Sequence, residues 1–171
     1  YKEKSENGTR KLQMYTATAV NGEQWGDLKP FPFNSKEYSV GHGTFSPDGK
    51  TVYFASDMPG GVGGVDIYKT VREGGVGWGK PINIKEVNTE GDEMFPFFHE
   101  SGILFFASDG HVGLGGLDVF YTQVKDGLVS SKVRNAGAPV SSSKDDFYLV
   151  LNEKPINIKE VNTEGLSLIH I

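Results

Sequence analysis

Two aspartates that follow glycine pairs are the residues best suited to bind a metal ion. Asp66 and Asp118 each end a Gly-Gly-x-Asp run, and they lie 52 residues apart. The glycine pairs are Gly63-Gly64 and Gly115-Gly116. A carboxylate beside loop carbonyls offers the oxygen ligands that calcium prefers. Calcium-binding nonapeptide repeats, however, stack about every nine residues, so this wide spacing cannot form their ladder of shared ligands. We therefore interpret both aspartates as loop caps, with calcium as the alternative.

A second pair of acids follows the serines of two matching Phe-Ala-Ser-Asp segments. These pairs are Ser56-Asp57 and Ser108-Asp109. We expect the carboxylates of Asp57 and Asp109 to accept hydrogen bonds from backbone N–H groups of the glycine loops that follow them. A catalytic carboxylate pair needs two acids a few ångströms apart on one surface. Equivalent positions on neighbouring units are farther apart than that, so the pattern does not favour catalysis.

No other group of residues has the spacing of a catalytic or cofactor site. His42, His99 and His111 lie at unrelated repeat positions without metal-ligand spacing. The chain has no cysteine and no Gly-x-Ser-x-Gly nucleophile elbow. The glycine runs around 60–64 and 113–116 lack the spacing and the following helix of a phosphate-binding loop. We predict no enzymatic activity, no cofactor and no metal.

The composition favours an all-β protein with one substantial core. Of the 171 residues, 37% are hydrophobic and 12% aromatic, and the 23 glycines cluster between runs of Val, Ile, Phe and Tyr. The formal net charge of −5, with acids and bases interspersed, provides no basic surface for nucleic acid. No apolar run approaches the roughly 20 residues of a membrane span. We expect no nucleic-acid partner and no direct membrane insertion.

An internal repeat organises the sequence. Residues 45–68 read FSPDGKTVYFASDMPGGVGGVDIY, and residues 98–120 read FHESGILFFASDGHVGLGGLDVF. The period is 52 residues, because the Phe-Ala-Ser-Asp segments begin at Phe54 and Phe106. A repeat of this length is too long for most solenoids, and a sandwich would not repeat.

Each repeat predicts about four antiparallel strands. A first strand ends before the turn Pro47-Asp48-Gly49, where proline and glycine suit the turn positions. The second strand, 51–56, is apolar on both faces, which indicates a covered strand. A third strand follows the glycine loop at 65–71, and a short fourth lies near 81–84. This pattern is typical of a β-propeller blade.

The repeat predicts a partial β-propeller with about two complete four-stranded blades and two partial ones. The predicted boundaries are 1–37 for a partial blade, 38–91 and 92–140 for two blades, and 141–153 for the start of the next. Residues 154–165 copy 80–91 without a change, and the final LSLIHI resembles a translated sequencing adapter. We interpret 154–171 as a duplication or adapter artefact and exclude it from fold reasoning, with a genuine recent duplication as the alternative. We expect the whole chain to be a fragment.

Particular stretches of the repeat resemble a known family. SPDGKTVYFASD followed by GGVGGVDIY resembles the WD-like propeller repeat of TolB-type proteins. GDEMFPFFHESGILFFASDGHVGLGGLDVF and APVSSSKDDF are similar to propellers in OmpA-family envelope proteins of Bacteroidetes-like bacteria. The resemblance covers 39–151 and implies a periplasmic, outer-membrane-associated scaffold with protein partners, in some members within secretion or gliding machinery. It implies peptidoglycan binding only through an OmpA-like domain that this chain lacks.

Three functions are consistent with a propeller. A protein-binding scaffold is the preferred interpretation, and a glycan-binding module and a propeller-fold hydrolase are the alternatives. Trp25 and Trp78 recur at one repeat position, where we expect packing in the core or between blades rather than an exposed sugar-binding platform. An unclosed ring would leave an apolar face, of the 52–55 or 104–107 type, in contact with water. We therefore expect residues 1–153 alone to be aggregation-prone or only marginally folded.

Overall fold

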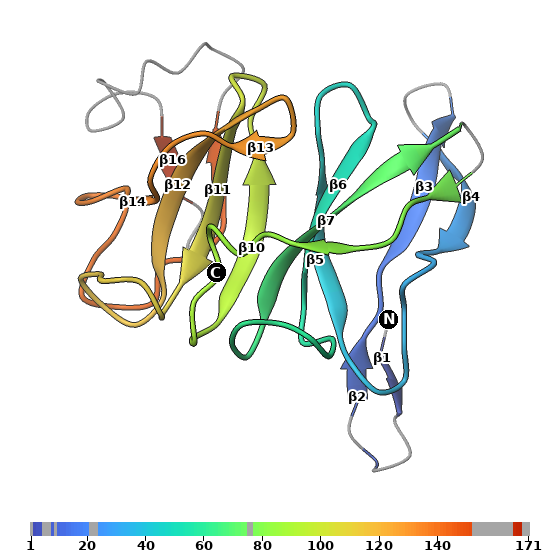
Figure 1. Cartoon of the computed structure of the whole chain (residues 1–171), viewed down its shortest axis with the longest axis horizontal. Coiled ribbons are helices and arrows are strands. Elements are labelled where there is room, and N and C mark those ends of the chain that lie inside the picture. The colour runs from blue at the N-terminus through green and yellow to red at the C-terminus, as the bar shows by residue number, and fades with distance from the viewer. Residues whose placement is uncertain are drawn as a thin grey trace.

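The computed structural model consists of antiparallel β-sheets and contains no helix among the residues it describes (Figure 1). It describes residues 2–4, 8, 10–20, 24–74, 77–151 and 166–168. The all-β prediction is therefore confirmed. In these ranges no helix is long and apolar enough to cross a membrane. The strands are β1 (Lys2–Lys4), β2 (Arg10–Leu12), β3 (Tyr15–Val20), β4 (Gln24–Pro30), β5 (Val40–Phe45), β6 (Thr51–Ser56), β7 (Asp66–Glu73), β8 (Gly77–Trp78), β9 (Ile82–Asn83), β10 (Glu93–Phe98), β11 (Ile103–Ser108), β12 (Asp118–Lys125), β13 (Leu128–Val129), β14 (Arg134–Asn135), β15 (Leu149–Leu151) and β16 (Leu166–Leu168).

Two five-stranded sheets share one strand order. The first sheet runs β5-β6-β7-β8 with β9 also paired to β7, and the second runs β10-β11-β12-β13 with β14 paired to β12. Their registers match, because Thr51 pairs with Val71 and Ile103 pairs with Gln123, 52 residues later in both strands. The predicted fourth strand is present as β9, but it has only two residues and β8 precedes it. The predicted blade boundaries stay predictions.

The predicted turn after β5 is held by its aspartate. The Asp48 carboxylate accepts hydrogen bonds from the Ser46 hydroxyl at 2.6 Å and from the Lys50 N–H at 3.0 Å. The Ser46 hydroxyl, followed by the Lys50 N–H, holds the pKa of Asp48 below its usual value. Gly49 follows Pro47-Asp48 with φ of 66°, a conformation that glycine adopts without strain.

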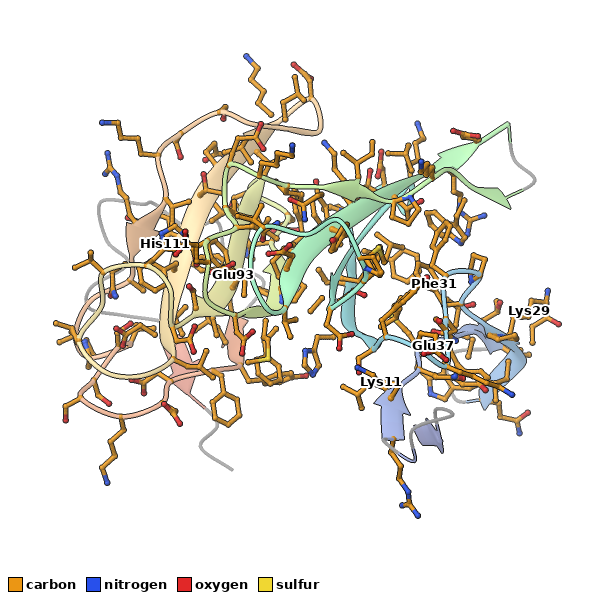
Figure 2. All side chains as sticks on the ribbon, turned by 60° about the horizontal axis from the view of Figure 1, so that its bottom comes forward. Lys11, Lys29, Phe31, Glu37, Glu93 and His111 are labelled. Carbon is orange, nitrogen blue, oxygen red and sulfur yellow. The ribbon has the colours of Figure 1, made fainter. Side chains whose placement is uncertain are left out.

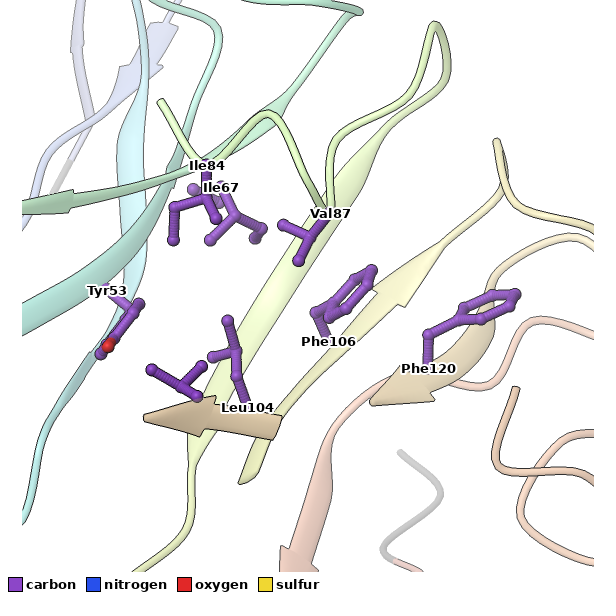
Figure 3. Packing of buried hydrophobic residues seen from close by; sticks show 9 residues of the cluster. Tyr53, Ile67, Ile84, Val87, Leu104, Phe106 and Phe120 are labelled. Carbon is purple, nitrogen blue, oxygen red and sulfur yellow. The ribbon is translucent and has the colours of Figure 1, made fainter. Parts of the chain in front are cut away.

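The two sheets pack face to face. Alternate residues of β6 point in opposite directions, as the twofold period of a strand requires. Tyr53 therefore faces the second sheet and joins the cluster shown in Figure 3, whereas Phe54 faces the other way. That cluster comprises Tyr53, Ala55, Ile67, Ile84, Val87, Leu104, Phe106, Phe120 and Val124. Burying this apolar surface between the sheets is the main force that joins them.

The expectation that an apolar face of the 52–55 or 104–107 type is exposed to water is wrong. The side chains of 52–55 and 104–107 are all buried. The outer face of the first sheet is covered by Phe31, with Phe33 and Tyr38 packed beside it. The far face of the second sheet is covered by Val140 and Leu149. Segments on either side of the two sheets thus shield both outer faces, so exposure of these faces gives no reason for aggregation.

The hairpin of β3 and β4 repeats the outer part of the first sheet. Tyr15 pairs with Pro30, and Tyr68 pairs with Asn83, a difference of 53 in both numbers. The pairing of Ala19 with Trp25 likewise matches that of Arg72 with Trp78. The hairpin therefore has the geometry of the third and outer strands of a unit.

At the other end of the molecule β15 pairs with β16, and the label of β16 lies beside the second sheet in Figure 1, far from β3 and β4. Residues 166–168 are thus strand-paired. The rest of the segment 154–171, which we interpret as an artefact, lies outside the described residues.

Candidate functional site

Each glycine loop lies against the segment that leads into the next sheet. At the first junction, the Val65 N–H donates to the Asp92 carboxylate at 2.7 Å, and the Glu93 N–H donates to the Val65 carbonyl at 2.6 Å. The Gly64 N–H also donates to the Gly91 carbonyl at 3.0 Å. The end of one loop is therefore tied to the start of β10.

The same junction recurs on both sides. The Leu117 N–H donates to the Asp145 carboxylate at 3.1 Å, and the Asp146 N–H donates to the Leu117 carbonyl at 2.6 Å. Upstream, the Leu12 N–H donates to the Ser39 hydroxyl at 3.1 Å. Leu12, Val65 and Leu117 are 53 and 52 residues apart. The residue types differ, with valine at one of the three donors and serine at one of the three acceptors, but the backbone N–H donor and the side-chain oxygen acceptor keep their places.

The repeated glycines permit this close approach. A Cβ atom at Gly63 would overlap the carbonyl oxygens of Thr89 and Gly91, and one at Gly115 would overlap the Lys144 carbonyl. Both glycines lie outside the left-handed region, so the constraint is steric rather than conformational. The recurrence of Gly-Gly in the sequence therefore reflects contact between successive units.

Asp66 and Asp118 cap the glycine loops, as the capping interpretation expects. The Asp66 carboxylate accepts hydrogen bonds from the N–H groups of Val62 at 2.5 Å and Gly63 at 3.2 Å, and from the Asn83 amide at 3.0 Å. The corresponding donors to Asp118 are Leu114, Gly115 and Asn135. Both carboxylates are buried at the first residue of a strand. They join each loop to the strand that follows it.

The same geometry bears on the calcium alternative. Converging N–H donors place positive charge toward the carboxylates, which opposes a cation at the same oxygens. Oδ1 of Asp118 is buried and accepts no hydrogen bond from the protein atoms. Within the ranges that the structure describes, no cluster of three or more His, Asp or Glu side chains could hold a metal ion. Calcium binding stays the alternative, and titration tests it.

The expected partners of Asp57 and Asp109 are wrong. Asp57 accepts a hydrogen bond from the Ser39 N–H and forms an ion pair with Lys11 at 2.6 Å. Asp109 accepts a hydrogen bond from the Asp92 N–H at 2.8 Å. Both aspartates therefore point back to the residue before the neighbouring first strand, not forward to the glycine loop.

The serines take the role that we assigned to these aspartates. The Ser56 hydroxyl accepts a hydrogen bond from the Met58 N–H at 3.1 Å, and the Ser108 hydroxyl accepts one from the Gly110 N–H at 3.0 Å. Side chains alternate along a strand, so the serine and the following aspartate point in different directions. The glycine loop after each strand folds back over the face on which the serine side chain lies.

The histidines have separate surroundings. The His99 Nδ1 lies 2.8 Å from the Ser101 hydroxyl, and the His111 Nε2 lies 2.8 Å from the Val87 carbonyl. Nδ1 of His42 is buried without a hydrogen-bond partner. Loss of water contact lowers the pKa of His42 below its usual value. These contacts do not form a shared metal or catalytic centre.

A row of rings at the starts of the first strands was missed by the sequence reasoning. His42, Phe95 and Tyr148, each 53 residues from the next, all have positive φ, at 52°, 52° and 75°. The ring of His42 stacks on that of Phe95 at 4.1 Å, and Phe95 stacks on Phe147 at 5.1 Å. Bulky residues rarely adopt a positive φ, and each residue held there destabilises the folded state by about 1–3 kcal/mol. The recurrence of a ring every 53 residues was the signal available in the sequence.

The two tryptophans have different surroundings. Trp78 is half-buried, with its ring 6.4 Å from Phe31 and 6.0 Å from Phe45. The guanidinium of Arg72 lies 4.8 Å from its centroid. Trp25 is 78% exposed. Packing between units is therefore confirmed for Trp78 and wrong for Trp25.

The buried acids take part in structural hydrogen bonds. Glu93 accepts hydrogen bonds from the hydroxyls of Thr89 at 2.6 Å and Ser108 at 2.7 Å, and Asp146 accepts one from the Ser142 N–H at 2.6 Å. These contacts tie strand starts to neighbouring loops.

No protein-family model matches the chain, and no curated protein sequence matches it significantly.

Proposed function

We propose that the chain is part of a non-enzymatic β-propeller scaffold that binds protein partners in a bacterial cell envelope. The observation that carries this proposal is the junction at Leu12, Val65 and Leu117, which recurs with a period of 52–53 residues. A propeller requires each blade to contact the next in the same way. A recurring junction between face-packed antiparallel sheets supports that arrangement.

Exposed apolar side chains support partner binding, and they lie at the end of the sheets where the glycine loops form the junctions. The glycine loops place apolar side chains in solvent at this end, including Val112, which is 97% exposed, together with Val62 and Leu114. The buried Asp66 and Asp118 hold the bases of these loops. Rigid sheets that carry differing loops are suited to protein recognition. The periplasmic, outer-membrane-associated location is supported by the family resemblance of 39–151.

A photo-crosslinking residue at Val112 tests the partner class. We expect it to capture a discrete protein from a bacterial envelope extract. The matched control is the same residue at Leu128, which is 65% exposed on β13, at the opposite end of β12. Equal capture from both positions, or capture from neither, would contradict a partner surface at the glycine loops.

Glycan binding is the second candidate, because rings are exposed beside the aromatic row. Tyr148 is 53% exposed and its neighbour Phe147 is also exposed. Sugars stack their C–H faces on such rings. Titration with chitotetraose, followed by aromatic NMR shifts of Phe147 and Tyr148, tests this candidate. Unchanged shifts at millimolar ligand would remove it.

A further inference from the structure

The hairpin of β3 and β4 presents an apolar surface to solvent. Trp25 is 78% exposed and Leu28 of the same strand is 71% exposed. Figure 2 shows Lys29 of the same hairpin at the outer margin of the molecule, with Phe31 turned toward the first sheet. Exposed apolar side chains gathered on one element mark an interaction surface. We call this surface the Trp25 face.

The structure itself shows what covers the same position one unit later. Trp78 has the cross-strand position of Trp25, displaced by 53 residues. Its ring packs against Phe31, in the connection directly after the preceding hairpin, and against Phe45, which ends the first strand of its own sheet. A surface that covers Trp25 in the same way must therefore contain two parts. One is the connection that follows the outer strand of a preceding unit, and the other is the first strand of the unit to which Trp25 belongs.

That combination exists at the opposite end of this chain. Ala136 corresponds to Phe31, because its N–H donates to the Val119 carbonyl at 2.8 Å as that of Phe31 donates to the Met14 carbonyl at 2.9 Å. Leu151 ends β15, as Phe45 ends β5. Ala136 and Leu151 pack in the same cluster on the second sheet. We call their surroundings the Leu151 face.

We propose that the Trp25 face binds the Leu151 face of a second copy of this chain, head to tail. The two faces lie at opposite ends of the molecule (Figure 1), so one chain cannot join its own ends. In the pair, β15 of one copy and the β3–β4 hairpin of the other occupy the places that β5, β7 and β8 occupy in the first sheet. A head-to-tail interface closes into a ring or extends as a chain, according to its rotation.

This inference rests on the repeat arrangement in the proposed function, but not on the partner captured at the glycine loops. The glycine loops and the Trp25 face belong to different elements, so either surface can fail without the other. A chain that stays monomeric yet crosslinks a partner through Val112 would overturn the self-association alone.

Light scattering of purified full chain tests self-association. We expect the wild type to exceed the monomer mass, and Trp25→Ser to weaken association by about 30-fold, the scale of a lost aromatic anchor. Leu28→Ser should weaken it as well. The matched control is Leu128→Ser, because Leu128 is also an exposed leucine, at 65%, but lies on β13. A monomeric wild type at the highest soluble concentration, or equal effects of L28S and L128S, would overturn the proposal.

Mixing two defective variants tests the head-to-tail geometry. Trp25→Ser weakens one face and Leu151→Glu disrupts the other, so each variant alone should be monomeric at a concentration at which the wild type associates. Their equimolar mixture retains one intact interface and should form a dimer and nothing larger. A mixture that stays monomeric, although both variants melt cooperatively, would overturn the proposal.

A cysteine version covers the case in which Leu151→Glu fails to fold. The chain has no native cysteine. Under oxidation, Trp25→Cys mixed with Leu151→Cys should give a disulfide-linked dimer that neither variant forms alone. Linkage of Trp25→Cys to itself would indicate a head-to-head pair and overturn the proposal.

Discussion

Replacing Gly63 by alanine should destabilise the protein by separating two units. The added Cβ would overlap the carbonyl oxygens of Thr89 and Gly91, which belong to the segment leading into β10. Because these are backbone atoms, no rotamer change can relieve the overlap. Either the glycine loop or the leading segment must move, and the junction between the sheets must open.

The size of the effect follows from the contacts at the junction. Three hydrogen bonds cross it, from Gly64 to Gly91, from Val65 to Asp92 and from Glu93 to Val65. At about 1 kcal/mol net each, their complete loss would lower the free energy of unfolding by about 3 kcal/mol. Alanine also restricts the unfolded chain, which offsets about 0.4–1 kcal/mol. We expect a net loss of about 2 kcal/mol, within the usual range for overpacking.

Urea denaturation of Gly63→Ala measures this loss. The matched control is Gly77→Ala, because a Cβ at Gly77 meets no atom within 4 Å and its φ is not positive. The control should match the wild type or exceed it slightly. If Gly63→Ala unfolds within about 0.5 kcal/mol of Gly77→Ala, the ordinary scatter of a surface change, then the close approach does not stabilise the junction.

Three further changes test other contacts. Asp66→Ala removes the acceptor for three donors and should destabilise the protein by about 2–3 kcal/mol in urea denaturation; calcium that raises the wild-type melting temperature by several degrees would contradict a pure capping role. Burial, followed by the charge of Asp48, raises the pKa of Tyr53 to about 12. The contribution of Tyr53 to the free energy of unfolding should therefore be complete below pH 10 and be lost as the pH rises toward 12. A Tyr53→Phe variant that keeps the same alkaline loss would show that other groups cause it. Burial lowers the pKa of His42, so its contribution to the free energy of unfolding should be present above pH 6.5 and fall as the pH drops below that value. His42→Phe should therefore reduce the fall of the melting temperature at acid pH, and an unchanged fall would contradict the assignment.

The strand pattern was predictable because two strong local signals agree. Runs such as 51–56 are apolar on both faces, and turn residues such as Pro47-Asp48-Gly49 bound them, so both strand and hairpin follow from short-range chemistry. The cover over the outer faces was not predictable. Phe31 and Leu149 lie in segments without a strong repeat signal, and only their packing shows that they shield the sheets.

The roles of individual polar residues were predictable only in part. The positions of Asp66 and Asp118 after a glycine loop indicate capping, because the acceptor and its donors are close in sequence. Asp57 and Asp109 instead bond to residues 18 and 17 positions away, across the sheet. The direction of a side chain at the end of a strand depends on how the next loop folds, which local sequence does not specify.

The recurring junction has a consequence for how such a gene can change length. Each unit meets its neighbours through the backbone N–H of Leu12, Val65 or Leu117 and the oxygen acceptor of Ser39, Asp92 or Asp145. An in-frame duplication of about one period supplies both halves of this contact at once, so the new unit needs no compensating substitutions at either border. Deletion of one period likewise brings compatible borders together. Unequal crossing-over between such segments can therefore alter copy number while the protein remains foldable, and divergence can then proceed in the exposed loops.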